Sequence, residues 1–126
     1  MAFHQTTILI VDDNADIREL ISEVARLAGF ATRVASNGAE ALDVVVTCLE
    51  LDAVVSDVMM PVMDGLQLAH RVRGIRPNLP VILMTGHSNK LDEVLQAGAV
   101  PLIKPFTAES FELSVRDAID ASSGEE

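Results

Sequence analysis

Short apolar runs alternate along the chain with longer segments in which apolar residues recur every three or four positions. The short runs are nearly continuous, which is typical of strands covered by helices on both faces. The longer segments have the spacing of amphipathic helices. The runs predict strands at 7–11, 31–36, 53–57, 80–85 and 99–104, and the longer segments predict helices at 14–28, 38–49, 64–73, 88–97 and 107–121.

The regular succession of strand and helix predicts an α/β fold, a doubly wound five-stranded parallel sheet flanked by five helices. Gly29 and Gly98 are expected to end two of the helices. The Val44–Val46 run is a poor helix former within the second helix. The expected apolar faces consist of Ile17, Leu20, Ile21, Val24, Leu27 and Ala28, then Leu42, Val45 and Leu49, then Leu66, Ala69 and Val72, and last Phe111, Val115, Ala118 and Ile119.

The length and composition favour one globular domain. We expect residues 1–126 to form it, with a core of about 6–120 and a frayed tail, since 126 residues with 49% hydrophobic content suffice for a buried core. No run predicts a membrane span, and the first residues do not resemble a signal peptide. Cys48 has no intrachain partner, so we expect a buried thiol and a cytoplasmic location.

The charge balance is strongly acidic, with 19 acidic and 9 basic residues and a net charge of −10. Such a chain is not expected to bind nucleic acid directly. One basic cluster lies where the third helix should end, and its cations would complement the helix dipole there. The alternative is a patch for partner docking, and the cluster consists of His70, Arg71, Arg73 and Arg76.

Polar residues gather at the ends of the predicted strands. Asp12 and Asp13 follow the first strand, Asp57 ends the third, Thr85 ends the fourth and Lys104 ends the fifth. The carboxyl ends of parallel strands share one edge, so these side chains should converge. Three carboxylates in one pocket repel and favour a hard cation such as Mg²⁺. A carboxylate can also attack phosphorus, which predicts Asp57 as a nucleophile that forms an aspartyl phosphate.

The motifs "ILIVDD", "SDVMMPVMDG", "ILMTGH" and "LIKPF" resemble the receiver domain of two-component response regulators over roughly residues 6 to 120. The resemblance implies a flavodoxin-like strand order of 2-1-3-4-5. It implies a phosphorelay signalling domain that catalyses its own phosphorylation and slow autodephosphorylation but is not otherwise an enzyme. The expected phosphodonor is a sensor histidine kinase or a histidine phosphotransfer protein.

The same resemblance assigns roles to individual residues. Asp57 is the phosphoacceptor, Thr85 the switch hydroxyl and Lys104 the partner of the acyl phosphate. The expected ligands of Mg²⁺, or alternatively Mn²⁺, are Asp12, Asp13, Asp57 and the backbone carbonyl of Met59, with Asp13 preferred over Asp12 as a direct ligand. The Lys104–Pro105 peptide bond is expected to be cis.

Three positions bear on how phosphorylation is transmitted to a partner and how fast the phosphoryl group is removed. Pro101 stands where such domains often carry an aromatic residue, so we expect phosphorylation to be read through shifts in residues 86–98 instead. Proline also suits an edge strand. Met59 and His87, each two residues after a site residue, are expected to tune the rate of dephosphorylation.

The resemblance places the partner surface on the fourth helix, fifth strand and fifth helix, and it allows either a monomer or a phosphorylation-dependent dimer. No output segment is evident in the sequence, so the downstream protein partner stays open. The chain is expected to be a single-domain regulator, a phosphotransfer shuttle, or a receiver taken from a hybrid kinase or a larger regulator. The residues expected on this surface are Lys90, Leu91, Val94 and Pro101, with Leu113 either exposed there or in the core.

Other functions fit the sequence less well. The seven glycines form neither a dinucleotide-binding nor a P-loop motif. A phosphatase of the haloacid-dehalogenase type would carry a second acid where Met59 stands. A receiver fold that acts as a phosphorylation-independent binding module is the remaining alternative, although all the expected acids and the lysine are present.

Overall fold

The computed structural model describes residues 5–86 and 88–123, and within them the predicted order of strands and helices is confirmed. The strands are β1 (Thr7–Val11), β2 (Ala31–Ala35), β3 (Leu51–Asp57), β4 (Val81–Thr85) and β5 (Val100–Ile103). The helices are α1 (Ala15–Leu27), α2 (Gly38–Thr47), α3 (Gly65–Ile75), α4 (Leu91–Gln96) and α5 (Ala108–Ser123), with a 3₁₀ turn η1 (Ser88–Lys90) before α4.

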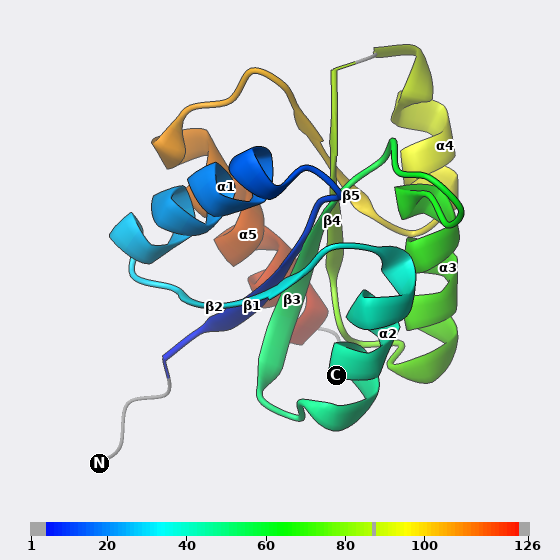
Figure 1. Ribbon diagram of the computed structural model, residues 1–126, viewed down its shortest axis with the longest axis horizontal. Coiled ribbons are helices and arrows are strands. Elements are labelled where there is room, and N and C mark those ends of the chain that lie inside the picture. The colour runs from blue at the N-terminus through cyan, green and yellow to red at the C-terminus, as the bar shows by residue number, and fades with distance from the viewer. Residues whose placement is uncertain (1–4, 87, 124–126) are drawn as a thin grey trace.

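The five strands form one parallel sheet in the order β2-β1-β3-β4-β5, as expected. Helices α1 and α5 cover one face, and α2, α3 and α4 cover the other (Figure 1). In the described part of the chain, no helix is both long and apolar enough to cross a membrane.

Alternation along each strand divides the buried side chains between two cores. In β1, Ile8 and Ile10 pack with α1 and α5, whereas Leu9 and Val11 pack with α2, α3 and α4. The central strands β3 and β4 divide their side chains in the same way. Because successive side chains point to opposite faces, the facing of the last residue in each strand is fixed by those before it.

The boundaries differ from prediction mainly at β3 and α4. Strand β3 begins at Leu51, which pairs with Thr7 across an irregularity in the β1–β3 register. The predicted helix over 88–97 is instead a 3₁₀ turn followed by a six-residue helix. Lys90 at the N-cap position of α4 makes no side-chain cap, so the first orphan N–H groups of that helix lack the help that α1, α2 and α3 receive.

The apolar stripe of α1 is wider than the part of it that reaches the core. Only Ile21 and Ala25 bury their apolar side chains fully, while Ile17, Leu20 and Leu27 are 38%, 60% and 79% exposed. The sheet and α5 cover a narrower strip of the helix than the spacing of apolar residues suggests. The prediction that these three residues belong to the core is therefore wrong. Leu49 is wrong for a related reason, since α2 ends at Thr47 and leaves that leucine exposed. The predicted apolar face of α5 is buried or packed against the core.

The basic cluster has a partly different role from the one expected. Arg76 does lie at the end of α3, but its guanidinium donates hydrogen bonds to carbonyls at the end of α2 and the start of β3. The acceptors are the carbonyl oxygens of Val45, Cys48, Leu49 and Leu51. Arg76 therefore joins two elements, and Cys48 beside it is buried as predicted.

Candidate functional site

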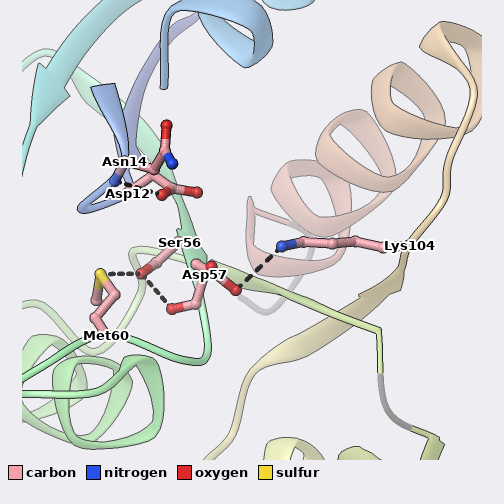
Figure 2. A network of polar contacts seen from close by, with 6 residues as sticks. All are labelled: Asp12, Asn14, Ser56, Asp57, Met60 and Lys104. Carbon is pink, nitrogen blue, oxygen red and sulfur yellow. Dashed lines mark hydrogen bonds and ion pairs between the residues drawn. The ribbon is translucent and has the colours of Figure 1, made fainter. Parts of the chain in front are cut away.

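The last residue of β3, Asp57, lies at the edge of the sheet where β1, β3 and β4 end. Its side chain is 16% exposed, and its Oδ1 lies 3.3 Å from the Nζ of Lys104. Figure 2 shows Lys104 reaching Asp57 from the side of β5, with Asp12 and Asn14 on the opposite side. The carboxylate at the tip of this apolar strand is thus paired and still reachable from solvent.

Asp12, one residue beyond β1, is the buried acid of the group, with only 1% of its surface exposed. Its Oδ1 accepts the backbone N–H of Asn14 at 2.9 Å, while its buried Oδ2 has no hydrogen-bond partner in the part of the chain that the structure describes. Burial raises the pKa of Asp12; the Asn14 bond and Lys104 oppose the rise, and the charges of Asp57 and Asp13 add to it. An unpaired oxygen of this kind is costly unless something positive occupies its side.

The three carboxylates form a compact set. One oxygen each from Asp12, Asp13 and Asp57 lies within 4.8 Å of the other two. The set combines a buried orphan oxygen with hard oxygen donors, and among residues 5–86 and 88–123 neither histidine nor cysteine belongs to it. These properties fit Mg²⁺ or Mn²⁺ rather than zinc.

Lys104 and Thr85 are joined through the backbone. Lys104 follows β5, its backbone N–H donates to the carbonyl of Thr85 at 2.9 Å, and its side chain is 35% exposed. Thr85 is buried at the end of β4. The peptide bond after Lys104 is cis, as expected. The ends of β4 and β5 thus carry the hydroxyl and the ammonium to the same edge as the acids.

The loop from Val58 to Asp64 connects Asp57 to α3, and contacts with Gly65 and Ser56 fix the backbone of Asp57. Gly65 begins α3 with its N–H bonded to the Val58 carbonyl at 2.8 Å, and a Cβ there would lie 2.3 Å from the carbonyl oxygen of Asp57. Ser56 is fully buried and donates its hydroxyl to that same carbonyl at 2.9 Å. The close approach of Gly65 requires a residue without a Cβ.

Sequence reasoning missed Ser56 and Arg18 as supports of the site. Ser56 reads as an ordinary strand residue, and Arg18 as one more charge on a helix surface. Arg18 donates from Nη1 to the backbone carbonyl of Asp12 at 2.8 Å. A spacing of six residues between an acid and an arginine at the start of a helix is the available signal, but it is weak on its own.

The functional roles assigned to the site residues all stay predictions. The side chain of Met59 is 60% exposed beside the site, and the assignment of its carbonyl as a metal ligand stays a prediction. His87 lies outside the described residues.

On the expected partner surface, Val94 is a correction. It is the one buried residue of this short helix and packs in the core, so its side chain is not on the surface expected to contact a partner. Lys90, Leu91 and Pro101 are half-buried, and Leu113 is 55% exposed. Pro101 lies in β5, which is an edge strand as predicted.

Comparison with known proteins gives a consistent result. The model of the response regulator receiver domain family matches residues 8–116. The regulatory protein AtoC of Escherichia coli is 37% identical over 119 residues, covering 92% of this chain and 26% of that protein. The response regulator MprA of a Mycobacterium species is 34% identical over 122 residues, covering 94% of this chain and 53% of that protein. The chain therefore spans between a quarter and about half of the length of these relatives.

Solved structures agree with the fold. A response regulator receiver domain protein from Clostridium thermocellum superposes with a TM-score of 0.87 at 29% identity, covering 96% of this chain and 99% of that one. The chemotaxis protein CheY4 of Vibrio cholerae superposes with a TM-score of 0.83 at 30% identity, covering 90% of this chain and 98% of that one.

Proposed function

The chain belongs to the response regulator receiver domain family, whose members receive signals from histidine kinases in two-component systems, and from this premise we propose that Asp57 is its phosphoacceptor. One observation carries the proposal. Asp57 is the carboxylate that has Lys104 on one side, at 3.3 Å, and the oxygens of Asp12 and Asp13 on the other, within 4.8 Å. A nucleophile between a cation and a metal-binding pocket is suited to phosphoryl transfer.

The proposed step is a transfer between two side chains. A carboxylate oxygen of Asp57 forms a bond to phosphorus while the bond between phosphorus and the imidazole nitrogen of a donor phosphohistidine breaks. The leaving nitrogen keeps the electron pair of the broken bond, and the imidazole takes up a proton from the solvent. Hydrolysis of the acyl phosphate later returns the free carboxylate and inorganic phosphate. The donor is a sensor histidine kinase or a histidine phosphotransfer protein.

We assign the metal pocket to Asp12, Asp13, Asp57 and the backbone carbonyl of Met59. The fit rests on the orphan oxygen of Asp12 and on the all-oxygen donor set. When bound, Mg²⁺ would neutralise charge that develops on the phosphoryl oxygens. Lys104 supplies a second positive charge from the opposite side. The Thr85 hydroxyl is assigned as the switch group that donates a hydrogen bond to the phosphoryl group.

We propose that Met59, two residues after Asp57, sets the lifetime of the phosphoryl group. The Met59 side chain is 60% exposed, and its thioether sulfur is only a weak hydrogen-bond acceptor with which to orient an attacking water. Replacing Met59→Asn should therefore change the rate of phosphoryl loss, measured as the decay of phosphorylated intact mass after removal of the donor. An unchanged decay would contradict this role, and His87 is proposed as a second tuning position.

Phosphorylation is proposed to be read through residues 86–98, since Pro101 lacks the aromatic rotamer used by many receivers. Helix α4 is suited to movement because it has only six residues and just one of them, Val94, is buried. Amide chemical shifts of the free and phosphorylated protein provide the test. Changes limited to the first contacts of Asp57, with none in 86–98, would contradict the idea.

The partner surface is proposed on α4, β5 and α5. Exposed apolar side chains support it there, with Leu95 at 59%, Ile103 at 43% and Leu113 at 55% exposed, beside the half-buried Lys90, Leu91 and Pro101. This surface would serve either a downstream protein or a phosphorylation-dependent dimer.

The experiment that tests the function is a time course of intact mass with Mg²⁺ and a small phosphodonor. A gain of one phosphoryl group is expected in the native protein, and none in Asp57→Asn. No gain with either a small donor or a histidine kinase would favour a phosphorylation-independent binding module. A gain that survives in Asp57→Asn would move the phosphoacceptor to another residue.

A further inference from the structure

Arg18 is the fourth residue of α1, and its side chain turns back to the loop that precedes the helix. Its Nη1 donates to the backbone carbonyl of Asp12 at 2.8 Å in a partly buried contact. The guanidinium therefore holds the peptide unit between the two acids Asp12 and Asp13.

The rest of this loop is fixed by hydrogen bonds from the other direction. Asp12 accepts the N–H of Asn14 at 2.9 Å. The Asn14 side chain in turn accepts the N–H groups of Asp16 and Ile17 at 2.9 and 3.0 Å. The Arg18 bond closes this set, so that the first turns of α1 and the end of β1 form one hydrogen-bonded unit.

The contact that Arg18 makes with the pocket is to the backbone, through the bond from Nη1 to the Asp12 carbonyl. The charged groups that shift the pKa of Asp12 are Asp57, Lys104 and Asp13. The positive charge of Arg18 helps to lower the pKa of Glu40, after the stronger effect of hydrogen bonds from Ser36. The hydrogen bond to the carbonyl thus favours a backbone effect over charge neutralisation.

We propose that Arg18 is a positioning residue for the metal pocket, holding the Asp12 carbonyl so that the carboxylates of Asp12 and Asp13 keep their directions. This inference rests on the metal pocket of the proposed function. Groups that orient metal ligands from behind commonly change metal affinity when they are removed.

A charge effect of Arg18 and a positioning effect of Arg18 predict opposite changes in Mg²⁺ affinity when the residue is replaced. Loss of a cation near an acidic pocket would strengthen the attraction for Mg²⁺ through the long-range field. Loss of the hydrogen bond to Asp12 would weaken Mg²⁺ binding, because the ligands would no longer be held in place. The sign of the change therefore separates the two.

The chain offers a matched control in Arg26. It lies in the same helix and carries the same charge, but it pairs with Glu23 at 2.6 Å on the surface. The experiment measures Mg²⁺ binding to the unphosphorylated protein by isothermal titration calorimetry in the native form, Arg18→Gln, Arg18→Lys and Arg26→Gln. Thermal unfolding of each variant checks that it is folded.

Affinity should fall about tenfold in Arg18→Gln, fall less in Arg18→Lys, and stay equal or rise slightly in Arg26→Gln. In metal-free Arg18→Gln, the amide resonances of Asp13 and Asn14 should also move. Equal affinities in Arg18→Gln and Arg26→Gln would overturn the inference while the metal pocket stands. Absence of Mg²⁺ binding in the native protein would overturn the pocket and the inference together. If Arg18→Gln does not fold, Arg18→Met decides, because it keeps the aliphatic stem but cannot donate; affinity equal to that of Arg26→Gln with unmoved amides in this variant contradicts the proposal.

Discussion

Val62 adopts a φ of +70° in the loop between Asp57 and α3, and its side chain is fully exposed. The turn is tight, since the N–H of Met63 donates to the carbonyl of Pro61 at 2.8 Å across it. A β-branched residue is strained at positive φ because its Cβ approaches the following carbonyl oxygen. The loop that follows Asp57 therefore carries a residue that disfavours its own backbone conformation.

Replacing Val62→Gly should raise the free energy of unfolding by about 1 kcal/mol, because glycine adopts positive φ without strain and the exposed side chain contributes no packing. Urea unfolding followed by circular dichroism measures the change. The control is Val46→Gly, an exposed valine in α2, which should lose stability since glycine is unfavourable within a helix. A loss of stability at both positions would contradict strain at Val62.

Asp12 offers a second test at the residue scale. In metal-free protein, Asp12→Asn should raise the free energy of unfolding by about 1 kcal/mol, because it removes a buried charge whose Oδ2 has no partner and which faces two other acids. Urea unfolding with a chelator present provides the measurement. Asp16→Asn changes the net charge equally on an exposed turn of α1 and should give no gain. An equal gain in both variants would assign the effect to net charge alone.

The acids, Thr85 and Lys104 were predictable because strand ends in a parallel sheet share an edge, and that rule needs only the strand boundaries. The supports of these residues were not. The bond from Arg18 to the Asp12 carbonyl and the strain at Val62 depend on the path of a loop, which apolar periodicity does not encode.

At the scale of elements, the order of strands and helices was predictable, but the extent to which each helix is buried was not. The stripe of α1 has the correct period and yet leaves Leu20 exposed, because burial depends on how much of the helix the sheet and α5 cover. Val94 shows the converse, a residue assigned to the surface that the short helix α4 turns into the core.

Helix α3 provides a test with its own internal control. A Cβ at Gly65 would meet the backbone of Asp57 and Val58, so Gly65→Ala must push α3 away from β3 and should cost about 1–3 kcal/mol of stability. Gly74, in the same helix, has open space around its Cβ position, so Gly74→Ala should be neutral or gain up to about 1 kcal/mol.

Chemical denaturation measures both variants of α3, and the phosphorylation rate of Gly65→Ala should also fall. A stable Gly65→Ala with native phosphorylation would show that α3 does not fix the position of Asp57.

For the whole molecule, the net charge of −10 and the cluster of three acids make stability sensitive to cations. A ligand present at a hundredfold excess over its dissociation constant stabilises the folded state by about 2.7 kcal/mol. Metal binding at one edge of the sheet should therefore raise the free energy of unfolding of the entire domain.

Saturating Mg²⁺ should therefore raise the melting temperature of the native protein by on the order of 10 °C, measured by differential scanning calorimetry. Sodium chloride of equal ionic strength controls for screening of the net charge. The Asp12→Asn variant should respond much less than the native protein. An equal rise in that variant would place the stabilising cation outside the pocket.

The division of each strand between two cores has a consequence for how the length of β3 can change. One residue inserted into β3 would turn the carboxylate of Asp57 toward α2 and α3, away from Lys104. Two inserted residues would restore its direction but carry it about 7 Å further out, past its neighbours. The length of a regular strand can thus change only in steps set by the pleat, unless the extra residue is taken up in a bulge like the register shift at the start of β3. Finer adjustments to this site come from side-chain exchange or from the loops beyond the strand ends.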